Sequence, residues 1–449
     1  MPKKYVIIGG DAAGMSAASK IRRMQPDSEL VVFEKGQHIS FAACGIPYWI
    51  SDVIEDGSKL QVLTPEIARE KRGIDVRIGH EVTQIDATSN TIAVNNLETG
   101  EKIHEAYDVL LIATGARAVV PPIPGVGHDG VFTLRSLADG QRIKNYIAEH
   151  EIKHATIIGG GYIGLEMAEA YKHINIDVTM VEMLDQIAPT FDKDILEKVT
   201  AHVVEQGVDL QLETRVDAID KSEQGLQVQT SAGQIQTDMV IVSTGVRPNS
   251  ELARDAGIAL GNSGAITIND HMQTSIPNIY SAGDCAEHRH LVLNEDIWIP
   301  LAPSANKGGR VAGENMVGTA TRFPGILGTA VVKVFDYTVA QTGLTEKQAR
   351  EAAIFKDIES TTISAGSRAH YYPGSTPVTI KLVADGTTKR LLGAQMIGKS
   401  DVAKRLDVLA TALTAGMTLE DIGMLDLTYA PPVAPVYDPI HVAANVANK

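Results

Sequence analysis

Cys44 is the residue with the clearest potential for chemistry in this chain. It is one of only two cysteines and lies in the segment Ser-Phe-Ala-Ala-Cys-Gly-Ile-Pro-Tyr at residues 40–48. A thiolate is the reactive form of cysteine, and a helix N-terminus is one environment that stabilises it. Because Gly45 and Pro47 predict the start of such a helix directly after Cys44, we interpret Cys44 as a redox centre. The alternative is a buried cysteine that packs as a small apolar side chain.

A glycine turn upstream of Cys44 predicts the first of two nucleotide sites. The apolar strand expected over Lys4 to Ile8 enters Gly9-Gly-Asp-Ala-Ala-Gly14 and then a helix rich in Ala and Ser, and a second strand closes at Glu34. In such units the turn places a pyrophosphate at the helix N-terminus, and an acid about 20 residues later accepts hydrogen bonds from ribose hydroxyls. Asp11 stands where the pattern has its middle glycine and should crowd the phosphate, so this match is weak when taken alone.

A second glycine turn matches the nucleotide pattern completely. An apolar strand ending at Ile158 leads into Gly159-Gly-Gly161-Tyr-Ile-Gly164, and the next predicted strand ends in Glu182. A carboxylate at that strand end suits an unphosphorylated ribose, and no arginine follows directly to hold a 2′-phosphate. NADH is therefore the expected donor, with NADPH less favoured. A tight turn without a ligand is the alternative, which two fingerprints in one chain disfavour.

Further apolar strands end in motifs that suit the edge of a nucleotide domain. Gly115 and Gly245 each close such a strand within a Thr-Gly pair, and Asp284 closes another within Ala-Gly-Asp. The Asp284 carboxylate could hydrogen-bond a polyol, although a helix N-cap is an equal reading of the bare chemistry. Cys285 comes directly after it and is interpreted as structural.

Composition restricts the class of protein and its partners. The chain has 449 residues, 44% of them hydrophobic, and a formal net charge of −15. That charge disfavours nucleic acid and anionic membrane surfaces as partners, so an anionic ligand would need a local basic pocket. We find no apolar stretch near the roughly 20 residues that a membrane helix needs. Two distant cysteines and an immediate first strand predict a protein of the reducing cytoplasm.

The order of these motifs resembles the two-dinucleotide flavoprotein disulfide reductases along essentially the whole chain. The resemblance implies an α/β fold with two Rossmann-like dinucleotide-binding domains, in the glutathione-reductase manner with one inserted in the other, and a C-terminal α+β dimerisation domain. The implied boundaries are 1–117 for the first part of the FAD-binding domain, 118–246 for the NADH-binding domain, 247–324 for the second part of the FAD-binding domain and 325–449 for the dimerisation domain.

The same resemblance assigns cofactor roles residue by residue. For FAD it implies Gly9, Gly14, Glu34, Ala113, Gly115 and Asp284. For NADH it implies Gly159, Gly161, Gly164 and Glu182, with Tyr162 as the nicotinamide gate over the flavin and Glu166 close to the flavin centre. We assign no metal site.

Within the family, the single cysteine resembles the coenzyme A disulfide reductase branch. Tyr371 in Tyr-Tyr-Pro-Gly and Tyr429 in Tyr-Ala-Pro-Pro are part of this resemblance, whereas the second cysteine and the His-Pro-Thr motif of glutathione reductases are not present. NADH oxidases and peroxidases carry a histidine where this chain has Ala12. Relatives usually have asparagine where this chain has Ala43, which removes one contact to a thiol substrate. Coenzyme A disulfide and coenzyme A persulfide or polysulfide therefore both stay open as substrates.

The implied reaction passes a hydride from NADH to FAD and then an electron pair to a mixed disulfide on Cys44. Tyr429 or Tyr371, contributed across a homodimer with shared active sites, would protonate the leaving thiolate, and ordinary interface packing is the alternative. Coenzyme A would be bound as substrate or ligand by Ser40, Arg22, Arg23 and Lys71, although such basic residues often only face solvent.

Two other functions remain open at this point. One is an NADH oxidase or peroxidase in which Cys44 cycles through a sulfenic acid. The other is a flavin redox sensor or interaction protein with slow turnover. An intact second fingerprint that includes Tyr162 favours turnover.

Overall fold

A parallel five-stranded sheet carries the first glycine turn. The computed structural model describes residues 3–449, so the first two residues of the predicted FAD-binding segment lie outside the described residues. The strand order is β18-β7-β1-β2-β3, with all neighbours parallel. The strands are β1 (Lys4–Ile8), β2 (Glu29–Phe33), β3 (Asp75–Arg77), β7 (Val109–Ile112) and β18 (Ile279–Ser281). Strands β1, β2 and β7 are mostly apolar because both faces of the sheet are covered, as is usual for parallel sheets.

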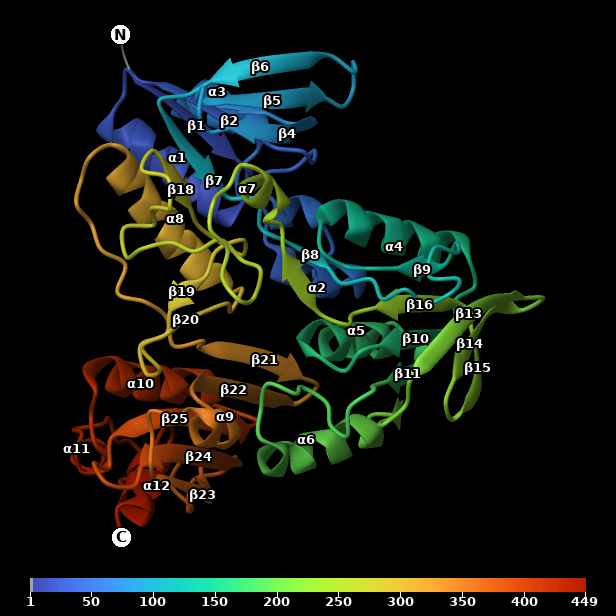
Figure 1. Ribbon diagram of the computed structural model, residues 1–449. Coiled ribbons are helices and arrows are strands. Elements are labelled where there is room, and N and C mark those ends of the chain that lie inside the picture. Colours follow the sequence, from blue (N-terminus) through green and yellow to red (C-terminus); the bar gives the residue numbers. More distant parts are fainter. Residues whose placement is uncertain (1–2) are drawn as a thin grey trace.

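Helices cover one face of this sheet and a smaller sheet covers the other. Helix α1 (Ala12–Met24) packs along α8 (Ala302–Met316), and both join the core on the first face. The second face packs against α7 and a three-stranded antiparallel sheet. These elements are β4 (His80–Asp86), β5 (Thr91–Asn96), β6 (Lys102–Ala106) and α7 (Glu251–Asp255). Figure 1 shows this first unit around the N-terminus.

The chain leaves the first unit and returns to it at adjacent points. It leaves through β8 (Ala116–Ala118) and returns through β17 (Val246–Pro248), and these two strands pair antiparallel. Strand β18 then pairs with β7 in the first sheet. The residues between the two crossings therefore form a unit of their own.

The inserted unit repeats the same architecture around the second glycine turn. Its parallel sheet has the order β12-β11-β10-β16-β9, and a three-stranded antiparallel sheet, β13-β14-β15, packs on one face. The strands are β9 (Val131–Phe132), β10 (His154–Ile158), β11 (Asp177–Val181), β12 (Val208–Gln211), β13 (Val216–Ser222), β14 (Gly225–Thr230), β15 (Gly233–Thr237) and β16 (Met239–Val242). The helices are α4 (Leu137–Glu149), α5 (Tyr162–His173) and α6 (Lys193–Glu205).

The C-terminal unit is an antiparallel sheet packed against helices. Its strand order is β21-β22-β25-β24-β23. The strands are β21 (Ala330–Val334), β22 (Tyr337–Gly343), β23 (Ile358–Gly366), β24 (Pro377–Asp385) and β25 (Leu391–Gly398). The helices are α9 (Glu346–Glu351), α10 (Val402–Ala415), α11 (Leu419–Gly423) and α12 (Pro439–Ala447). Strand β21 contacts α5 and β25 contacts α6, so this unit packs against the inserted one (Figure 1).

These observations confirm the predicted fold class. The strands expected before Gly9, Glu34 and Glu182 are present, over 4–8, 29–33 and 177–181. The helix expected after Cys44 is α2 (Ile46–Ile50), a helix of 5 residues preceded by a 3₁₀ turn over Ala43–Gly45. The remaining elements are α3 (Pro65–Arg72), β19 (His288–Arg289), β20 (Asp296–Ile297) and a 3₁₀ turn over Gly57–Leu60. Within residues 3–449, we find no helix long and apolar enough to cross a membrane.

Candidate active site

The first glycine turn is built for close backbone approach. Gly9 has φ +106°, and a Cβ there would lie 2.1 Å from the Ala113 carbonyl oxygen. A Cβ on Gly14 would lie 1.9 Å from the carbonyl oxygen of Gly9, so helix and strand can only pack this tightly with glycine. Ala113 and Gly115 follow the carboxyl end of β7. Among the described residues no side chain caps α1, which leaves its first N–H groups available to an anion such as pyrophosphate.

Two carboxylates and one arginine border this turn. Glu34 follows β2 and accepts hydrogen bonds from the N–H groups of Gly10 at 2.7 Å and Gly36 at 2.6 Å. Asp284 lies beyond β18, and the Arg135 guanidinium donates to its carboxylate at 2.5 Å. Acceptors at these two strand ends suit the hydroxyls of a ribose and of a flavin polyol. The residues of the first unit therefore fit FAD.

Asp11 binds the backbone of the segment that carries Cys44. Its carboxylate accepts from the Phe41 N–H at 3.2 Å. Burial raises the pKa of Asp11 to about 6, the Phe41 N–H opposes this rise, and the nearby Glu34 carboxylate adds to it. The sequence predicted only that this side chain would crowd the phosphate. The structure shows that it also ties the glycine turn to the cysteine segment.

Cys44 lies in an exposed turn at the start of α2, and its pKa differs from the sequence expectation. The side chain is exposed in the 3₁₀ turn that precedes the helix. The surrounding protein desolvates the thiol and raises its pKa, the Glu166 carboxylate raises it further, and Arg135 lowers it. We expected a helix N-terminus to stabilise the thiolate. That expectation is corrected, because desolvation and the Glu166 carboxylate raise the pKa of the thiol and the lowering by Arg135 does not outweigh them.

Glu166 connects the two nucleotide units. It lies on α5 of the inserted unit, whereas Cys44 and Tyr48, whose pKa values it raises, belong to the first unit. Burial raises the pKa of Glu166 itself to about 7, and the charge of Glu169 adds to the rise. A carboxyl group with this pKa can change its protonation near neutral pH. Its charge acts on the Cys44 thiol, whose pKa it raises.

The second glycine turn is also built for a dinucleotide. The Glu182 carboxylate accepts from the Gly160 N–H at 2.7 Å and from the Leu184 N–H at 2.8 Å. No described atom comes within 4 Å of where a Cβ on Gly161 would lie, so the approach to the start of α5 is open. A Cβ on Gly164 would lie 2.1 Å from the carbonyl oxygen of Gly159, as in the first turn. The residues fit a nicotinamide dinucleotide.

Of the predicted coenzyme A contacts, Arg22 lies close to Gly73 at the end of α3, the helix that carries Lys71. Arg22 donates to the carbonyl of Ser28 at 2.9 Å, and its Nε lies 3.8 Å from a Cβ built on Gly73, which caps the helix that ends with Lys71 and Arg72. Arg23 donates to the Ser19 carbonyl within α1. Ser40 has φ +47°, and its N–H donates to the Gly10 carbonyl at 3.0 Å. Part of the hydrogen-bonding capacity of Arg22 is thus used within its own turn.

Sequence reasoning missed a second row of polar residues, on α8. Ser16 of α1 donates to Asn306 of α8 at 2.8 Å, and Lys20 pairs with Glu314 at 2.7 Å. Arg310 lies between these contacts on the same face of α8, because its position is four residues from each. It also missed Arg135, which bonds Asp284 across 149 residues. The only sequence signal near Arg135 is the capping box of Ser136 and Asp139, which marks a helix start and no ligand.

Tyr371 and Tyr429 form a pair on the C-terminal unit. Their hydroxyl oxygens lie 3.2 Å apart, and the residues are 64% and 49% exposed. The hydrogen bond to Tyr429 raises the pKa of Tyr371. Tyr429 lies in the segment between α11 and α12, and Figure 1 shows both helices on the side of this unit remote from α2. The structure therefore brings the two predicted tyrosines together.

The family comparison identifies the chain. A family model described as pyridine nucleotide-disulphide oxidoreductase matches residues 3–309, and the dimerisation domain of these proteins matches residues 329–439. The chain belongs to the pyridine nucleotide-disulphide oxidoreductases. Members of this family share the fold described above, with two nucleotide-binding units and a C-terminal dimerisation domain.

Individual relatives match over almost the whole chain. The protein is 42% identical over 447 residues to the NAD(P)H coenzyme A polysulfide/persulfide reductase of Pyrococcus horikoshii, covering 99% of this chain and 98% of that protein. It is 37% identical over 447 residues to the NADH oxidase of Methanocaldococcus jannaschii, covering 99% of each. The crystal structure of reduced Bacillus anthracis CoADR-RHD superposes with a TM-score of 0.97 at 42% identity, covering 100% of this chain and 80% of that one.

The predicted family, enzyme class and cofactors are thereby confirmed. The protein is an oxidoreductase that uses FAD and NAD(P)H. Its C-terminal unit is the dimerisation domain of the family, which supports a homodimer.

Proposed function

We propose that this enzyme uses NADH to reduce coenzyme A disulfides and coenzyme A persulfides or polysulfides through FAD and Cys44. The observation that carries the proposal is the pair of free cysteines, of which Cys44 is exposed at the edge of the first unit and Cys285 is buried in its core. A buried thiol cannot close a reversible disulfide with an exposed one. The second sulfur of the redox cycle must therefore come from the substrate.

The residues of the chain suggest how each bond is made and broken. The Cys44 thiolate attacks one sulfur of the substrate, the substrate S–S bond breaks, and one thiolate leaves and takes a proton. FAD, when bound, supplies the electron pair from NADH that splits the resulting mixed disulfide. For a disulfide, NADH and one proton give two coenzyme A thiols and NAD⁺. For a persulfide, the same electron pair and proton give one coenzyme A thiol and hydrogen sulfide.

We further propose that the leaving thiolate is protonated by the partner subunit. The Tyr371 and Tyr429 hydroxyls form an exposed hydrogen-bonded pair, and the exposed apolar residues Val433, Val436 and Tyr437 follow Tyr429 closely in the chain. Exposed apolar side chains that gather in one segment form a surface that another chain should cover. In a homodimer with shared active sites, this pair would face the Cys44 of the partner.

The negative charge of the second strand end supports NADH over NADPH. Glu182 would face a 2′-phosphate with its like charge. Residues 183–192 contain no arginine or lysine, and Lys193 pairs with Asp185 at 2.5 Å.

Coenzyme A phosphates would be held along the surface between α1 and α8. Ser16, Lys20 and Arg23 share one face of α1, and Arg310 lies opposite them on α8. The cations of this surface are Lys20, Arg23 and Arg310, together with Arg22 and Lys71. They give an acidic protein the local positive charge that an anionic ligand needs. A free reactive thiol at Cys44 also favours the reducing cytoplasm as the protein's compartment.

Mass spectrometry of the purified protein tests the substrate directly. We expect a coenzyme A adduct on Cys44 that dithiothreitol removes, and NADH oxidation that rises strongly when coenzyme A disulfide or persulfide is added under anaerobic conditions. Failure of both substrates to accelerate NADH oxidation would contradict the proposal.

An NADH oxidase is the second candidate, because the M. jannaschii relative has that name and Cys44 is exposed without a partner cysteine. In that case oxygen would be consumed in proportion to NADH and added disulfide would not compete with it. An oxygen electrode, used with and without the disulfide, separates the two candidates.

A further inference from the structure

The hydroxyl of Tyr162 is held by two side chains from different parts of the molecule. It lies 3.0 Å from the Thr190 hydroxyl, and the Gln341 amide donates to it at 3.3 Å. The Tyr162 ring also meets the Phe191 ring edge to face, with centroids 6.2 Å apart. Gln341 belongs to β22, so the first residue of α5 is bonded directly to the dimerisation domain.

Thr190 lies in the segment 183–192, which we call the gate loop. The Ala188 N–H of this loop donates to the Gly160 carbonyl at 2.8 Å, which ties the loop to the glycine turn. At its end, the Asp192 N–H donates to the Gln395 side chain at 2.9 Å, and the Asp192 carboxylate accepts from the Glu346 N–H at 2.9 Å. The gate loop is thus fixed to the nucleotide site at one point and to the dimerisation domain at another.

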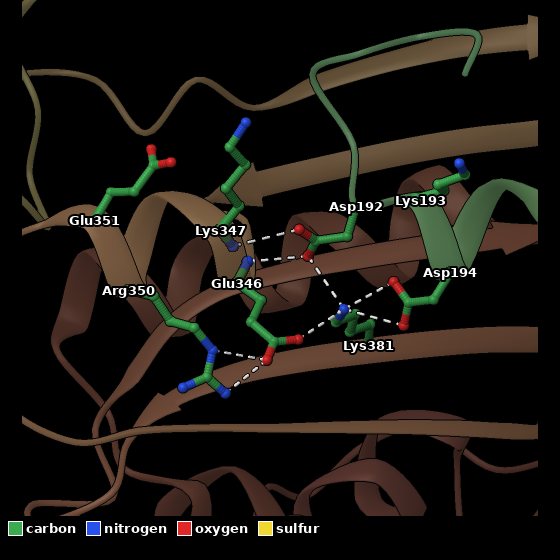
Figure 2. A pocket seen from close by; sticks show the side chains of 8 residues that line it. All are labelled: Asp192, Lys193, Asp194, Glu346, Lys347, Arg350, Glu351 and Lys381. Carbon is green, nitrogen blue, oxygen red and sulfur yellow. Dashed lines mark hydrogen bonds and ion pairs between the residues drawn. The ribbon is translucent and has the colours of Figure 1, made fainter. Parts of the chain in front are cut away.

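A buried lysine anchors the end of the gate loop. The Lys381 ammonium lies 3.3 Å from Asp192, 2.8 Å from Asp194 and 2.9 Å from Glu346, and its side chain is only 5% exposed. Figure 2 shows these carboxylates converging on Lys381 from the gate loop, α6 and α9. Burial raises the pKa of Glu346, but hydrogen bonds from Lys381, Arg350 and Ser360 outweigh it and bring the value to about 2. The cluster therefore stays ionised and holds the two units together at ordinary pH.

Helix α5 makes another contact with the same domain. Glu169 accepts from the Phe335 N–H at 2.8 Å and pairs with Lys333, at the turn between β21 and β22. Tyr162, Glu166 and Glu169 are spaced four and three residues apart, so they share one face of α5. The face that carries the tyrosine is thus docked on the β21–β22 hairpin.

We propose that Thr190 and Gln341 are positioning residues that hold Tyr162 in the NADH-free enzyme, so that the dimerisation domain sets how readily the nicotinamide reaches the flavin. The inference rests on the proposed function and on the role that the family resemblance implies for Tyr162, as the residue that covers the nicotinamide site. NADH must then displace the ring and break both hydrogen bonds. Losing one such bond should shift the equilibrium between the held ring and the displaced ring toward the displaced ring by about two- to tenfold.

The test is the reductive half-reaction of the FAD-loaded enzyme, followed by flavin absorbance after anaerobic mixing with NADH. Gln341→Leu and Thr190→Val should each lower the apparent Kd for NADH by about two- to tenfold. Thr190→Ser keeps the hydroxyl and should restore the original Kd. Thr338→Val is the matched control, because it changes the same strand as Gln341 without touching Tyr162. Both test variants should also raise NADH-dependent oxygen uptake, because the flavin is covered for less of the time.

A double-mutant cycle separates positioning from a general loss of structure. Tyr162→Phe removes the shared hydroxyl, so Gln341→Leu and Thr190→Val should have no further effect on the Kd in that background. Additive effects in the Phe background, or an unchanged Kd in both single variants, would overturn the proposal. An unchanged Kd in Tyr162→Phe would also overturn it, since the two hydrogen bonds of the hydroxyl would then not hold the ring. No coenzyme A substrate enters this experiment, so its failure is distinct from a wrong substrate assignment.

Discussion

The two nucleotide units of this enzyme have nearly the same frame and differ in the segment that follows it. Gly9 and Gly159 both have φ +106°. Glu34 accepts from the Gly10 N–H at 2.7 Å, and Glu182 accepts from the Gly160 N–H at the same distance. In both units the loop after the second strand donates an N–H back to the turn, from Ser40 to the Gly10 carbonyl and from Ala188 to the Gly160 carbonyl.

The difference begins at the middle position of the glycine turn. The first unit has Asp11, whose carboxylate is bonded to the Phe41 N–H, whereas the second has Gly161 with open space around it. The returning loop carries Ser40 and then Cys44 in the first unit, and Thr190 in the second. The first turn is thus tied to the segment that carries Cys44, whereas the approach to the second turn is open. The two frames are alike, and the loops beyond them differ.

Removing the thiol should break the first unit's chemistry and leave the second unit's intact. Cys44→Ser cannot form a mixed disulfide, so disulfide turnover should disappear while FAD stays bound and NADH still reduces it. Steady-state assay and anaerobic flavin reduction measure the two halves separately. More than a few per cent of residual disulfide turnover would remove Cys44 from the mechanism.

Removing one hydroxyl of the tyrosine pair should slow only the disulfide half. Tyr429→Phe should reduce turnover by roughly 10²- to 10⁴-fold, the usual contribution of a positioned acid, with flavin reduction by NADH nearly unchanged. Tyr371→Phe should do less alone. Since the two hydroxyls are bonded to each other, the double variant should be no slower than Tyr429→Phe.

Mixed dimers test whether the tyrosine acts on the partner's cysteine. A heterodimer of one Cys44→Ser chain and one Tyr429→Phe chain should contain one complete site if the sites are shared. A verified heterodimer with no recovered activity would place Tyr429 in its own subunit's site or outside the chemistry.

Changing the charge at the second strand end should alter only the choice of nucleotide. Glu182→Ala should narrow the preference for NADH over NADPH in kcat/KM by about tenfold or more, because a like charge beside a phosphate costs on the order of a few kcal/mol. Glu182→Gln is the matched variant, since it loses the charge and keeps an acceptor for the Gly160 N–H. An unmodified enzyme that prefers NADPH would show that our interpretation of Glu182 is wrong.

The smallest expected effect is that of a residue in the inserted unit, Glu166, on the thiol of Cys44 in the first unit. Burial raises the pKa of Cys44 and the Glu166 carboxylate raises it further, so Glu166→Gln should lower that pKa. Below the thiol's pKa, more thiolate should then be present, and alkylation of Cys44 by iodoacetamide should be a few times faster. Glu169→Gln is the control on the same helix. Equal alkylation profiles for the Glu166 variant and the original enzyme would mean that the two units do not interact through this residue.

Much of the site could be predicted from the sequence because its signals are local. Glycine turns, the strands around them and the acids at the strand ends are set by steric and hydrogen-bonding needs within a few tens of residues. The same locality explains the wrong expectation for Cys44. A proline and a glycine predict a helix start, but the pKa of the thiol depends on Glu166 and Arg135, which come from other units.

The sequence by itself therefore determined the two nucleotide frames and the family, since each is written in contiguous residues whose backbone demands only certain side chains can meet. Tertiary structure alone decided which distant groups meet: Asp284 with Arg135, Tyr371 with Tyr429, and Tyr162 with Gln341 of the dimerisation domain. Such pairs are fixed by how packed sheets and helices dock, and a single sequence carries no periodic or local signal of that docking. The nucleotide-binding turns are thus encoded locally, and the contacts between the units are decided by how the units pack.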